Sequence, residues 1–324
     1  MVVNDTVEVQ TIFVSPQGGG MEIIMPEQSL FDGDVIASRQ NRRIVELMKL
    51  DDRRAREKSR LFRFDGVKLL CEAIRRGVEL EGIFLRVGTA HKVADRMVEL
   101  YGCTISQARC PVFGVEDDLF EKISQENAPE GVITVAKYLD KSHKNIIIYN
   151  KDEIHLPSSA PVMLLESVRD PLNVGAIIRS AAALGVGHLI LSDDCADIYH
   201  PRTLRAAMGP LFSLPMTRVK DLPGSIRALR DQGRRVYAAA LDDSALCLGS
   251  PDWEAEQGSD RDCAAPCAAP CAAPCAVIGN EGHGLSSEVI AACDRSVYIP
   301  MEAGTESLNA GVAAALIMWE LCKR

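Results

Sequence analysis

The chain from about residue 161 onward alternates short apolar runs with amphipathic helical patterns. Runs such as "VMLLESV", "HLILS" and "RRVYAAAL" have the length of strands, and stretches such as "NVGAIIRSAAALG" between them have helical spacing. Because each helix must return the chain to the start of the next strand, the alternation predicts a mostly parallel sheet covered by helices. Ligands of such sheets bind beyond the carboxyl ends of the strands. The loops that follow the strands are therefore the expected place of a functional site.

The first part of the chain predicts a separate, smaller α/β unit. The pattern "RRIVELMKLDDRRAREKSRLF" has helical spacing, "VKLLCEAIRRGV" predicts a helix closed by Gly77, and "LEGIFLRVG" and "GVITVAK" predict strands. The start of the chain contains "SPQGGG" and no sustained periodicity, which is typical of an extension. The expected organisation is an extension over residues 1–35, an α/β domain over 36–140, a linker over 141–160 and a second α/β domain over 161–324.

Composition and termini narrow the class of protein. Hydrophobic residues make up 47% and charged residues 25% of the 324 positions, as in ordinary folded proteins. The apolar run over residues 310–319 is too short to cross a membrane, so we expect a buried helix and no membrane partner. The first ten residues lack the pattern of a secretory signal. We therefore expect a cytoplasmic protein whose eleven cysteines are reduced thiols.

Positive charge is concentrated in one segment. Between Arg39 and Lys68 the local charge is +6, although the whole chain has a net charge of −9. Lys and Arg that neutralise phosphates drive nucleic-acid binding, so the segment is a candidate RNA-binding surface. A solvated helix face with paired charges explains the same pattern, and charge alone leaves both interpretations open. The candidate RNA contacts are Arg53, Arg54 and Arg56.

A four-residue repeat, "CAAPCAAPCAAPC", lies between Cys263 and Cys275. Its four thiols suggest a site for a soft metal. The prolines forbid a continuous helix, and in an extended chain successive cysteines would be about 12 Å apart at roughly 3.1 Å per residue. Paired C-x-x-C spacing is also missing. The repeat therefore predicts an expanded surface loop over residues 250–275 and no metal site.

Three further segments, at residues 166–191, 277–286 and 298–320, are informative because of the order in which they occur. They read "ESVRDPLNVGAIIRSAAALGVGHLIL", "VIGNEGHGLS" and "YIPMEAGTESLNAGVAAALIMWE". Together they resemble the three signature motifs of the SpoU (TrmH-type) RNA 2′-O-ribose methyltransferases, a branch of the SPOUT superfamily. The segment "NRRIVELMKLDDRRAREKSRLFRFDGVKLLCEAI" resembles the N-terminal substrate-binding module common in that family, a ribosomal-protein-like α/β fold. The resemblance runs from about residue 39 to 324.

The resemblance implies a fold, a reaction and an assembly. The fold would be an α/β-knot, a mostly parallel sheet whose C-terminal segment forms a trefoil knot. The reaction would be methyl transfer from S-adenosylmethionine to a ribose 2′-hydroxyl in ribosomal or transfer RNA. The assembly would be a homodimer with each active site completed near the subunit interface. The alternative is a non-catalytic RNA-binding protein that keeps the fold, for which loss of Arg179, Glu281 or Asn309 would be expected, and all three are present.

Two candidate catalytic residues come from the first motif. The family pattern N-x-G-x-x-x-R-x-A is matched by Asn173, Gly175, Arg179 and Ala181. The resemblance places Arg179 in the active site. An arginine stays protonated in proteins and is therefore a poor general base, so binding phosphate and favouring the alkoxide is the more defensible role. The alternative is a helix arginine that pairs with an acid.

The other candidates follow later strands. Glu281 corresponds to the motif-two acid, and it could orient Arg179 or a polar group of the cofactor. His283 is interpreted as a loop residue, because the family pattern does not require histidine there. Ser307 and Asn309 precede the last helix, where both could cap it. Their match to the "SLN" of the third motif makes them candidate site residues as well.

The cofactor prediction also rests on the resemblance. The G-x-G-x-x-G expected of a dinucleotide site does not follow the first strand of the second domain. In the family, S-adenosylmethionine lies bent in the knot and is held largely by main-chain groups of the second and third motif loops. The residues that match these loops are Gly279, Asn280, Ile299, Met301 and Leu308.

Overall fold

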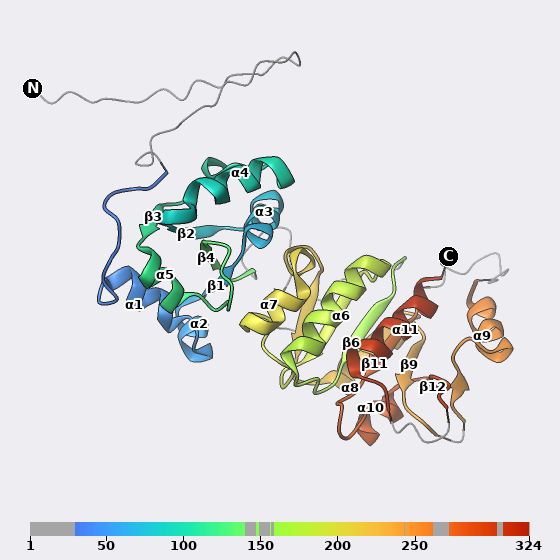
Figure 1. Ribbon diagram of the computed structural model, residues 1–324. Helices are drawn as coiled ribbons and strands as arrows, with labels where there is room; N and C mark the ends of the chain where they lie inside the picture. The colour runs from blue at the N-terminus through green and yellow to red at the C-terminus, as the bar shows by residue number, and fades with distance from the viewer. Residues whose placement is uncertain are drawn as a thin grey trace, which may run out of the picture.

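The chain forms two α/β domains that follow one another in sequence (Figure 1). The computed structural model describes residues 30–139, 147–148, 156, 159–242, 244–261, 272–302 and 307–323. Most of the predicted extension, most of the predicted linker and the repeat cysteines Cys263, Cys267 and Cys271 lie outside these residues. Within the described part, no helix is long and apolar enough to cross a membrane.

The N-terminal domain is built on a four-stranded mixed sheet in the order β1-β4-β2-β3. β4 is antiparallel to β1 and β2, and β2 is parallel to β3. The segment before α1 extends this sheet, because Asp32 and Ile36 form backbone hydrogen bonds with β3. The elements are β1 (Leu61–Asp65), β2 (Leu80–Arg86), β3 (Val112–Val115), β4 (Val132–Lys137), α1 (Arg42–Lys49), α2 (Arg53–Ser59), α3 (Val67–Arg76), α4 (Ala90–Tyr101) and α5 (Asp117–Ile123).

The long helical pattern near residue 50 is interrupted in the structure. α1 ends at Lys49, and α2 begins after Asp52, whose carboxylate accepts a hydrogen bond from the Ala55 amide at 2.9 Å. An N-cap of this kind satisfies a donor at the start of a helix and so favours a new start over continuation. The predicted end of α3 at Gly77 is confirmed, and this glycine has a φ of 69°, a left-handed conformation that closes helices.

The C-terminal domain contains an eight-stranded sheet in the order β10-β12-β9-β11-β6-β7-β8-β5. Every strand pair in it is parallel, so the predicted parallel sheet is confirmed. A strand order does not define a knot, and the trefoil knot stays a prediction. The strands are β5 (Ile147–Ile148), β6 (Val162–Leu165), β7 (His188–Ser192), β8 (Met216–Val219), β9 (Val236–Ala239), β10 (Leu246–Cys247), β11 (Cys275–Ile278) and β12 (Arg295–Tyr298).

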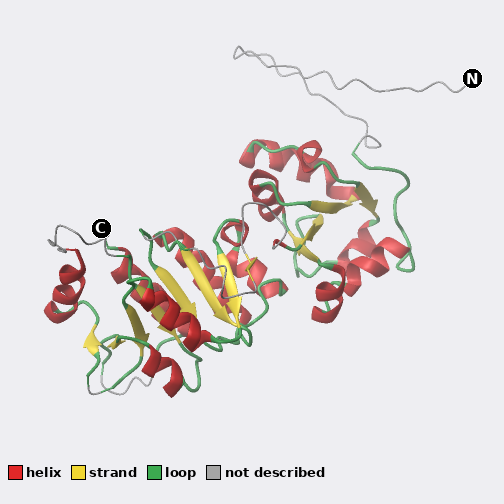
Figure 2. Cartoon of the chain, turned by 180° about the vertical axis from the view of Figure 1, so that it is seen from behind, coloured by secondary structure: helices red, strands yellow, loops and turns green. Residues whose placement is uncertain are grey.

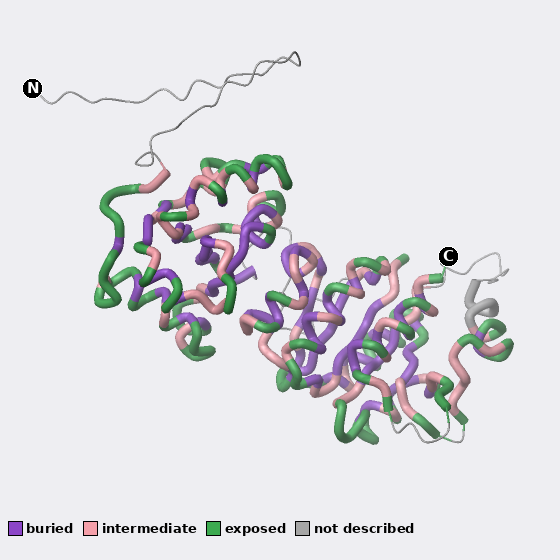
Figure 3. Tube along the Cα trace, in the orientation of Figure 1, coloured by how far each residue is buried: buried purple, intermediate pink, exposed green. Residues whose placement is uncertain are grey.

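Helices cover both faces of this sheet (Figures 1 and 2). Alternate residues of β6 show the two faces: Met163 and Leu165 belong to the core under α6 and α11, and Val162 and Leu164 belong to the core under α8 and α10. Buried residues accordingly concentrate on the strands and on the inner sides of the helices (Figure 3). The helices are α6 (Pro171–Leu184), α7 (Pro201–Ala207), α8 (Leu222–Asp231), α9 (Pro251–Arg261), α10 (Ser287–Ala292) and α11 (Ala310–Cys322).

The predicted loop over residues 250–275 is wrong at both of its ends. α9 occupies Pro251–Arg261 at the start of that range. At the other end Cys275 is the first residue of β11 and is fully buried in the core under α8 and α10. The apolar run Cys275–Ile278, directly after the last proline, is long enough to form a central strand of the sheet.

An aromatic cluster joins the two domains. Tyr199, which precedes α7, stacks on Tyr138 with ring centroids 3.9 Å apart and contacts Phe62 of β1 at 4.7 Å. The Tyr199 hydroxyl also accepts a hydrogen bond from the Leu139 amide at 2.9 Å. One continuous hydrophobic core therefore includes residues of both domains. A hydrophobic core that continues from one domain into the other fixes the relative placement of the two domains.

Candidate active site

The loops after β6 and β11 are fastened to each other at one edge of the sheet. The Glu166 carboxylate, at the end of β6, accepts hydrogen bonds from the backbone amide and the hydroxyl of Ser286, at 2.8 and 2.6 Å. The Asn280 amide, after β11, donates to the Ser167 carbonyl at 2.8 Å. Because β6 and β11 are parallel neighbours, their carboxyl ends coincide, and the first two sequence motifs meet there.

Three side chains from three distant segments form a continuous hydrogen-bonded network. Asn173 in α6 donates from Nδ2 to Glu281 Oε1 at 2.7 Å. The Asn173 Oδ1 accepts from Nδ2 of Asn309 at 2.8 Å. Asn173 is 7% exposed, so its amide depends on these two partners. Three of the predicted site residues are thus brought together.

Asn309 has a second task at the start of α11. Its Oδ1 accepts hydrogen bonds from the amides of Gly311 and Val312, at 2.9 and 3.3 Å, and so caps the helix. The predicted capping role of Asn309 is therefore confirmed. Ser307 is exposed and does not cap α11, so the expectation that both residues cap is wrong for Ser307. The cap belongs to Asn309 because only the residue directly before the first helical turn can reach its free amides.

The loop over residues 279–285 folds back on itself. Asn280 and Gly284 exchange two backbone hydrogen bonds, of 3.0 and 2.9 Å, and the Asn280 Oδ1 accepts from the amides of Gly282 and His283. A Cβ added at Gly279 would lie 2.3 Å from the Gly284 carbonyl carbon. Glycine at 279 is therefore required by a close approach of two backbone segments. The loop presents Glu281 and His283 as exposed side chains.

The loop after β6 carries a residue in an uncommon conformation that the sequence did not reveal. Ser167 has a φ of +54°, which is rare for a residue other than glycine. Its amide donates to the Ser192 hydroxyl at 2.8 Å, and its hydroxyl donates to Asp194 at 2.5 Å. Burial raises the pKa of the Asp194 carboxyl, but hydrogen bonds from Ser167, Ser192 and Arg169 outweigh it and hold the pKa below its usual value. The ionised Asp194 thus fixes the first motif loop.

The predicted cofactor residues fit a ligand with apolar and polar edges. Ile299 and Leu308 are half-buried and Met301 is exposed, so these residues offer apolar surface. Ile299 follows β12, whose carboxyl end lies at the same edge of the parallel sheet as that of β11. The main chain of Gly279 lies at the same edge. Asn280 differs from its predicted role in one respect: its side chain is engaged by Ser167 and by its own loop, so it shapes the site.

Arg179 lies apart from the network within one chain. It is six positions after Asn173 on α6, which places it about 240° around the helix and about 9 Å along it. Glu281 pairs with Asn173, not with Arg179. The Arg179 side chain is exposed, and among the described residues no acid pairs with it. Leu172, seven positions earlier and 49% exposed, lies on the same helix face.

The three predicted RNA contacts divide into two groups. Arg53 and Arg54 are exposed on α2, with Arg53 held by Glu57 at 2.8 Å. Arg56 is 2% exposed and forms an ion pair with Asp197 at 2.6 Å. Its prediction as an RNA contact is therefore wrong, because a guanidinium enclosed between the domains cannot reach a phosphate. The hydrophobic spacing of the sequence could not predict that Arg56 faces the other domain, because α2 has only seven residues.

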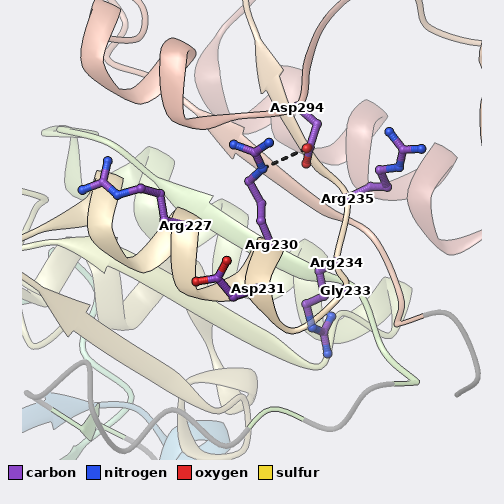
Figure 4. A pocket seen from close by; sticks show the side chains of 7 residues that line it. All are labelled: Arg227, Arg230, Asp231, Gly233, Arg234, Arg235 and Asp294. Atoms are coloured by element: carbon purple, nitrogen blue, oxygen red, sulfur yellow. Dashed lines mark hydrogen bonds and ion pairs between the residues drawn. The ribbon is translucent and has the colours of Figure 1, made fainter.

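A cavity of about 570 Å³ lined by four arginines lies elsewhere on the C-terminal domain (Figure 4). It lies where α8 leads into β9, at the amino ends of the strands, away from the motif loops. Arg230 pairs with Asp294 at 2.8 Å, and Arg235 pairs with Glu256 at 3.5 Å. Arg234 donates to the carbonyls of Ala160 and Ala273. These contacts of Arg230, Arg234 and Arg235 hold the ends of neighbouring segments together.

Metal ligation finds no support in the described part of the chain. No group of three or more His, Cys, Asp or Glu side chains is arranged there to hold an ion. Burial raises the pKa of the Cys275 thiol to about 12, which disfavours the thiolate that a metal would need. The other three repeat cysteines lie outside the described residues.

Comparison with known proteins relates both domains to one group of enzymes. The model of the SpoU rRNA methylase family matches residues 160–319, and that of the MRM3-like substrate binding domain matches residues 41–134. An uncharacterised tRNA/rRNA methyltransferase of Mycobacterium tuberculosis, Rv0881, is 33% identical over 72% of this chain and 72% of its own length. The 23S rRNA (guanosine(2553)-2′-O)-methyltransferase RlmP of Bacillus subtilis is 26% identical over 88% of this chain and 98% of its own length.

A solved structure extends the comparison to the bound cofactor. The SpoU methyltransferase AviRb from Streptomyces viridochromogenes, in complex with S-adenosylmethionine, is 27% identical and superimposes with a TM-score of 0.66. The match covers 87% of this chain and 97% of AviRb. The shared architecture therefore includes both domains.

Proposed function

The chain belongs to the SpoU rRNA methylase family, and on that premise we propose that it methylates one ribose 2′-hydroxyl in the RNA of the large ribosomal subunit. It is an S-adenosylmethionine-dependent RNA 2′-O-methyltransferase, and the N-terminal domain is its substrate-binding domain. The choice of ribosomal RNA follows the activity of RlmP, because this chain matches 98% of the length of that relative. A cytoplasmic location is part of the same proposal.

The network of Asn173, Glu281 and Asn309 is the observation that carries the proposal. Its members come from all three sequence motifs and meet at the carboxyl edge of the sheet, where ligands of parallel sheets bind. A fixed network of this kind supports catalysis by orientation, because methyl transfer requires the acceptor to be in line with the methyl group. S-adenosylmethionine, when bound, supplies the electrophilic methyl group.

Cofactor binding, positioning of Glu281 and binding of the acceptor are assigned to different residues of the protein. Gly279, Ile299 and Leu308, with Met301 nearby, would hold the cofactor through main-chain and apolar contacts, while Asn280 keeps the loop in shape. Asn173 and Asn309 are positioning residues for Glu281. Arg179 would hold the acceptor phosphate and favour the alkoxide, because a guanidinium remains charged and can bind in two-pronged fashion. Ser307 is retained as a candidate polar contact at the site.

We propose that two copies of the chain form the active enzyme. α6 and α11 pack side by side (Figure 1). On α11 the exposed residues Val312, Leu316 and Trp319 follow helical spacing, and Trp319 is 57% exposed. Arg179 and Leu172 are exposed on α6 and, seven positions apart, share one face of that helix. A second copy on this surface would cover the apolar residues and bring Arg179 to the subunit interface.

RNA would also contact the N-terminal domain. The exposed cations Arg53 and Arg54 on α2 support backbone binding there. Arg56 would not contact RNA itself. Its ion pair with Asp197 would hold α2, and so Arg53 and Arg54, in place against the C-terminal domain.

Mapping of 2′-O-methylation in RNA from a deletion strain tests the proposed substrate. We expect one position of the large-subunit ribosomal RNA to lose its methyl group and to regain it when the purified chain and S-adenosylmethionine are added. Loss of methylation only in transfer RNA would redirect the proposal to that substrate. If no position changed in either RNA, the substrate assignment would fail.

A further inference from the structure

An apolar groove lies on the N-terminal domain between α1, α2 and the beginnings of β1 and β2. Its volume is about 660 Å³, which is within the range of small-ligand sites. It lies outside the catalytic network, since none of its lining residues belongs to the three motifs. The apolar part of its lining includes Leu47, Leu61, Phe84, Pro111, Phe113 and Val135.

The Arg43 guanidinium lies over the Phe113 ring in this groove. The Arg43 guanidinium carbon lies 4.4 Å from the centroid of the Phe113 ring, and the ring is supported by Phe84 at 5.2 Å. A Cβ added at Gly82 would approach the Phe113 ring to 3.2 Å, so the backbone of β2 also confines it. Arg43 is exposed, and within the described residues it forms no ion pair. A planar cation over an aromatic ring is a surface on which a nucleic-acid base stacks.

Positive charge surrounds the same groove. Lys49 and Lys58 line it, are exposed and have no ion pair among the described residues. Of the two carboxylates in its lining, Glu46 is neutralised by Arg42 at 2.9 Å, which leaves Glu81. Three cations therefore face one unneutralised carboxylate. This imbalance in a chain of net charge −9 favours a partner that carries phosphates.

We propose that this groove binds one unpaired nucleotide of the substrate RNA. The base stacks on the Arg43 and Phe113 pair, and the flanking phosphates contact Lys49 and Lys58. The inference rests on the proposed function, because it takes RNA as the substrate. A base inside a duplex is stacked between its neighbours and cannot enter such a groove, so the expected partner is a loop, a bulge or a single strand.

The groove has a fixed position relative to the motif loops. α2 forms part of it, and Arg56 of the same helix is paired with Asp197 in the loop after β7. The distance from the bound base to the methyl acceptor is thereby set by the protein. A nucleotide held in the groove would help to select which ribose reaches the active site.

The test uses two short RNAs that differ only by one base. The first is a nine-residue chain of abasic ribose units with a single 2-aminopurine at its centre, and the second is abasic throughout. Both carry the same phosphates, so any difference in affinity for the full-length protein reports on the base. We expect the base to raise affinity about 10-fold, in the range of base–aromatic stacking, and the 2-aminopurine fluorescence to be quenched on binding.

Three variants locate the effect. Arg43→Ala and Phe113→Leu should remove the preference for the base, so that both RNAs bind equally. Arg42→Ala is the matched control, because Arg42 is the neighbouring exposed arginine of α1 and pairs with Glu46 outside the stacking pair. It should change affinity for the two RNAs by the same factor. Retained S-adenosylmethionine binding shows that a variant is folded. If Phe113→Leu unfolds the N-terminal domain, Arg43→Ala still provides the test, because Arg43 is exposed and its replacement leaves the core intact.

The outcomes are separable from those of the proposed function. Equal binding of the two RNAs by the unmodified protein, no binding of either, or a base preference that survives in Arg43→Ala would overturn the groove assignment. Methyl transfer to ribosomal RNA is measured independently with the same preparation. A protein that shows the base preference but transfers no methyl group would retain the groove and lose the proposed function.

Discussion

The Arg56 guanidinium, on α2 of the substrate-binding domain, lies 2.6 Å from the Asp197 carboxylate of the catalytic domain. The same guanidinium donates to the backbone carbonyls of Leu50 and Asp51, at 2.8 and 2.9 Å. Arg56 therefore closes the turn between α1 and α2 and fastens it to the loop after β7. That loop also contains Asp194, which holds the first motif loop through Ser167. One short segment thus contacts both the substrate-binding domain and the active site.

Replacing Asp197 with alanine should destabilise the protein by about 3 kcal/mol. The change leaves the charge of the enclosed Arg56 without its counter-ion, and breaking a buried pair at one partner carries a penalty of this order. The matched control is Glu57→Ala, which removes the partner of Arg53 in a pair that is half exposed and should change stability by less than about 1 kcal/mol. Urea unfolding followed by fluorescence measures both. Equal, small effects would show that the interdomain pair contributes little.

Arg179→Ala should reduce the rate of methyl transfer by a factor on the order of 100 while S-adenosylmethionine binding is retained. The guanidinium is expected to act on the acceptor phosphate and the developing alkoxide, so its contribution appears mainly in the transition state. Arg179→Lys should restore little activity, because a point charge does not reproduce two parallel hydrogen bonds. Single-turnover transfer on ribosomal RNA, with calorimetry of cofactor binding, provides the measurement. An unchanged rate would move the role to another residue.

Two substitutions at Asn309 separate its structural and functional roles. Asn309→Ala removes both the helix cap and the bond to Asn173, so it should lower stability by about 1 kcal/mol and impair both cofactor affinity and rate. Asn309→Asp keeps an oxygen that can cap α11 but removes the amide that donates to Asn173. We expect its unfolding free energy to remain near that of the unmodified protein while its transfer rate falls at least about 10-fold. A rate that follows stability alone in the two variants would argue against the positioning role.

Trp319→Glu should convert the proposed dimer into a monomer. It places a charge on the apolar face of α11, where a partner would have to bury it. Val98→Glu is the control, because Val98 is similarly exposed but lies on α4 of the substrate-binding domain. Sedimentation at micromolar concentration should show a dimer for the unmodified protein and for Val98→Glu. A monomeric unmodified protein would contradict the proposed assembly.

The stability of the protein should fall as the pH is lowered from about 6.5 to 4, in part because of His188. This side chain is buried beside Thr217, and burial, helped by the nearby Arg234, lowers its pKa to about 4 from an ordinary value of 6.5. Between these values the unfolded chain binds a proton that the folded protein does not, so stability rises with pH and is lost on acidification. The full contribution is about 3 kcal/mol.

The comparison with His188→Gln isolates that contribution. Glutamine can still hydrogen-bond to Thr217 but does not titrate. Urea unfolding at pH 7 and pH 4.5 should show a larger loss of stability for the unmodified protein than for the variant. Identical losses would mean that other groups account for the acid sensitivity.

Local patterns in the sequence determined the elements and the identity of the motif loops. Alternating runs predicted the parallel sheet, since residues on a strand or helix report by their spacing which face is buried. They also placed Gly279, Glu281 and Asn309 after strands, and Asn309 could be recognised as a helix cap because capping depends on neighbouring residues only. The resemblance of the three motifs then gave the chemistry.

Contacts between distant segments were decided only by the tertiary structure. Asn173 meets Glu281 across 108 positions and Asn309 across 136, and no periodicity reports such pairs. The sequence does not distinguish Arg56 from Arg53 and Arg54 on α2. Packing against the other domain buries Arg56 and makes it an interdomain ion-pair partner of Asp197. The contact between Ser167 and Asp194 was not predicted either, because it also joins separate segments of the chain. Spacing along the chain specifies a face, whereas the partner on that face is set by how the elements pack.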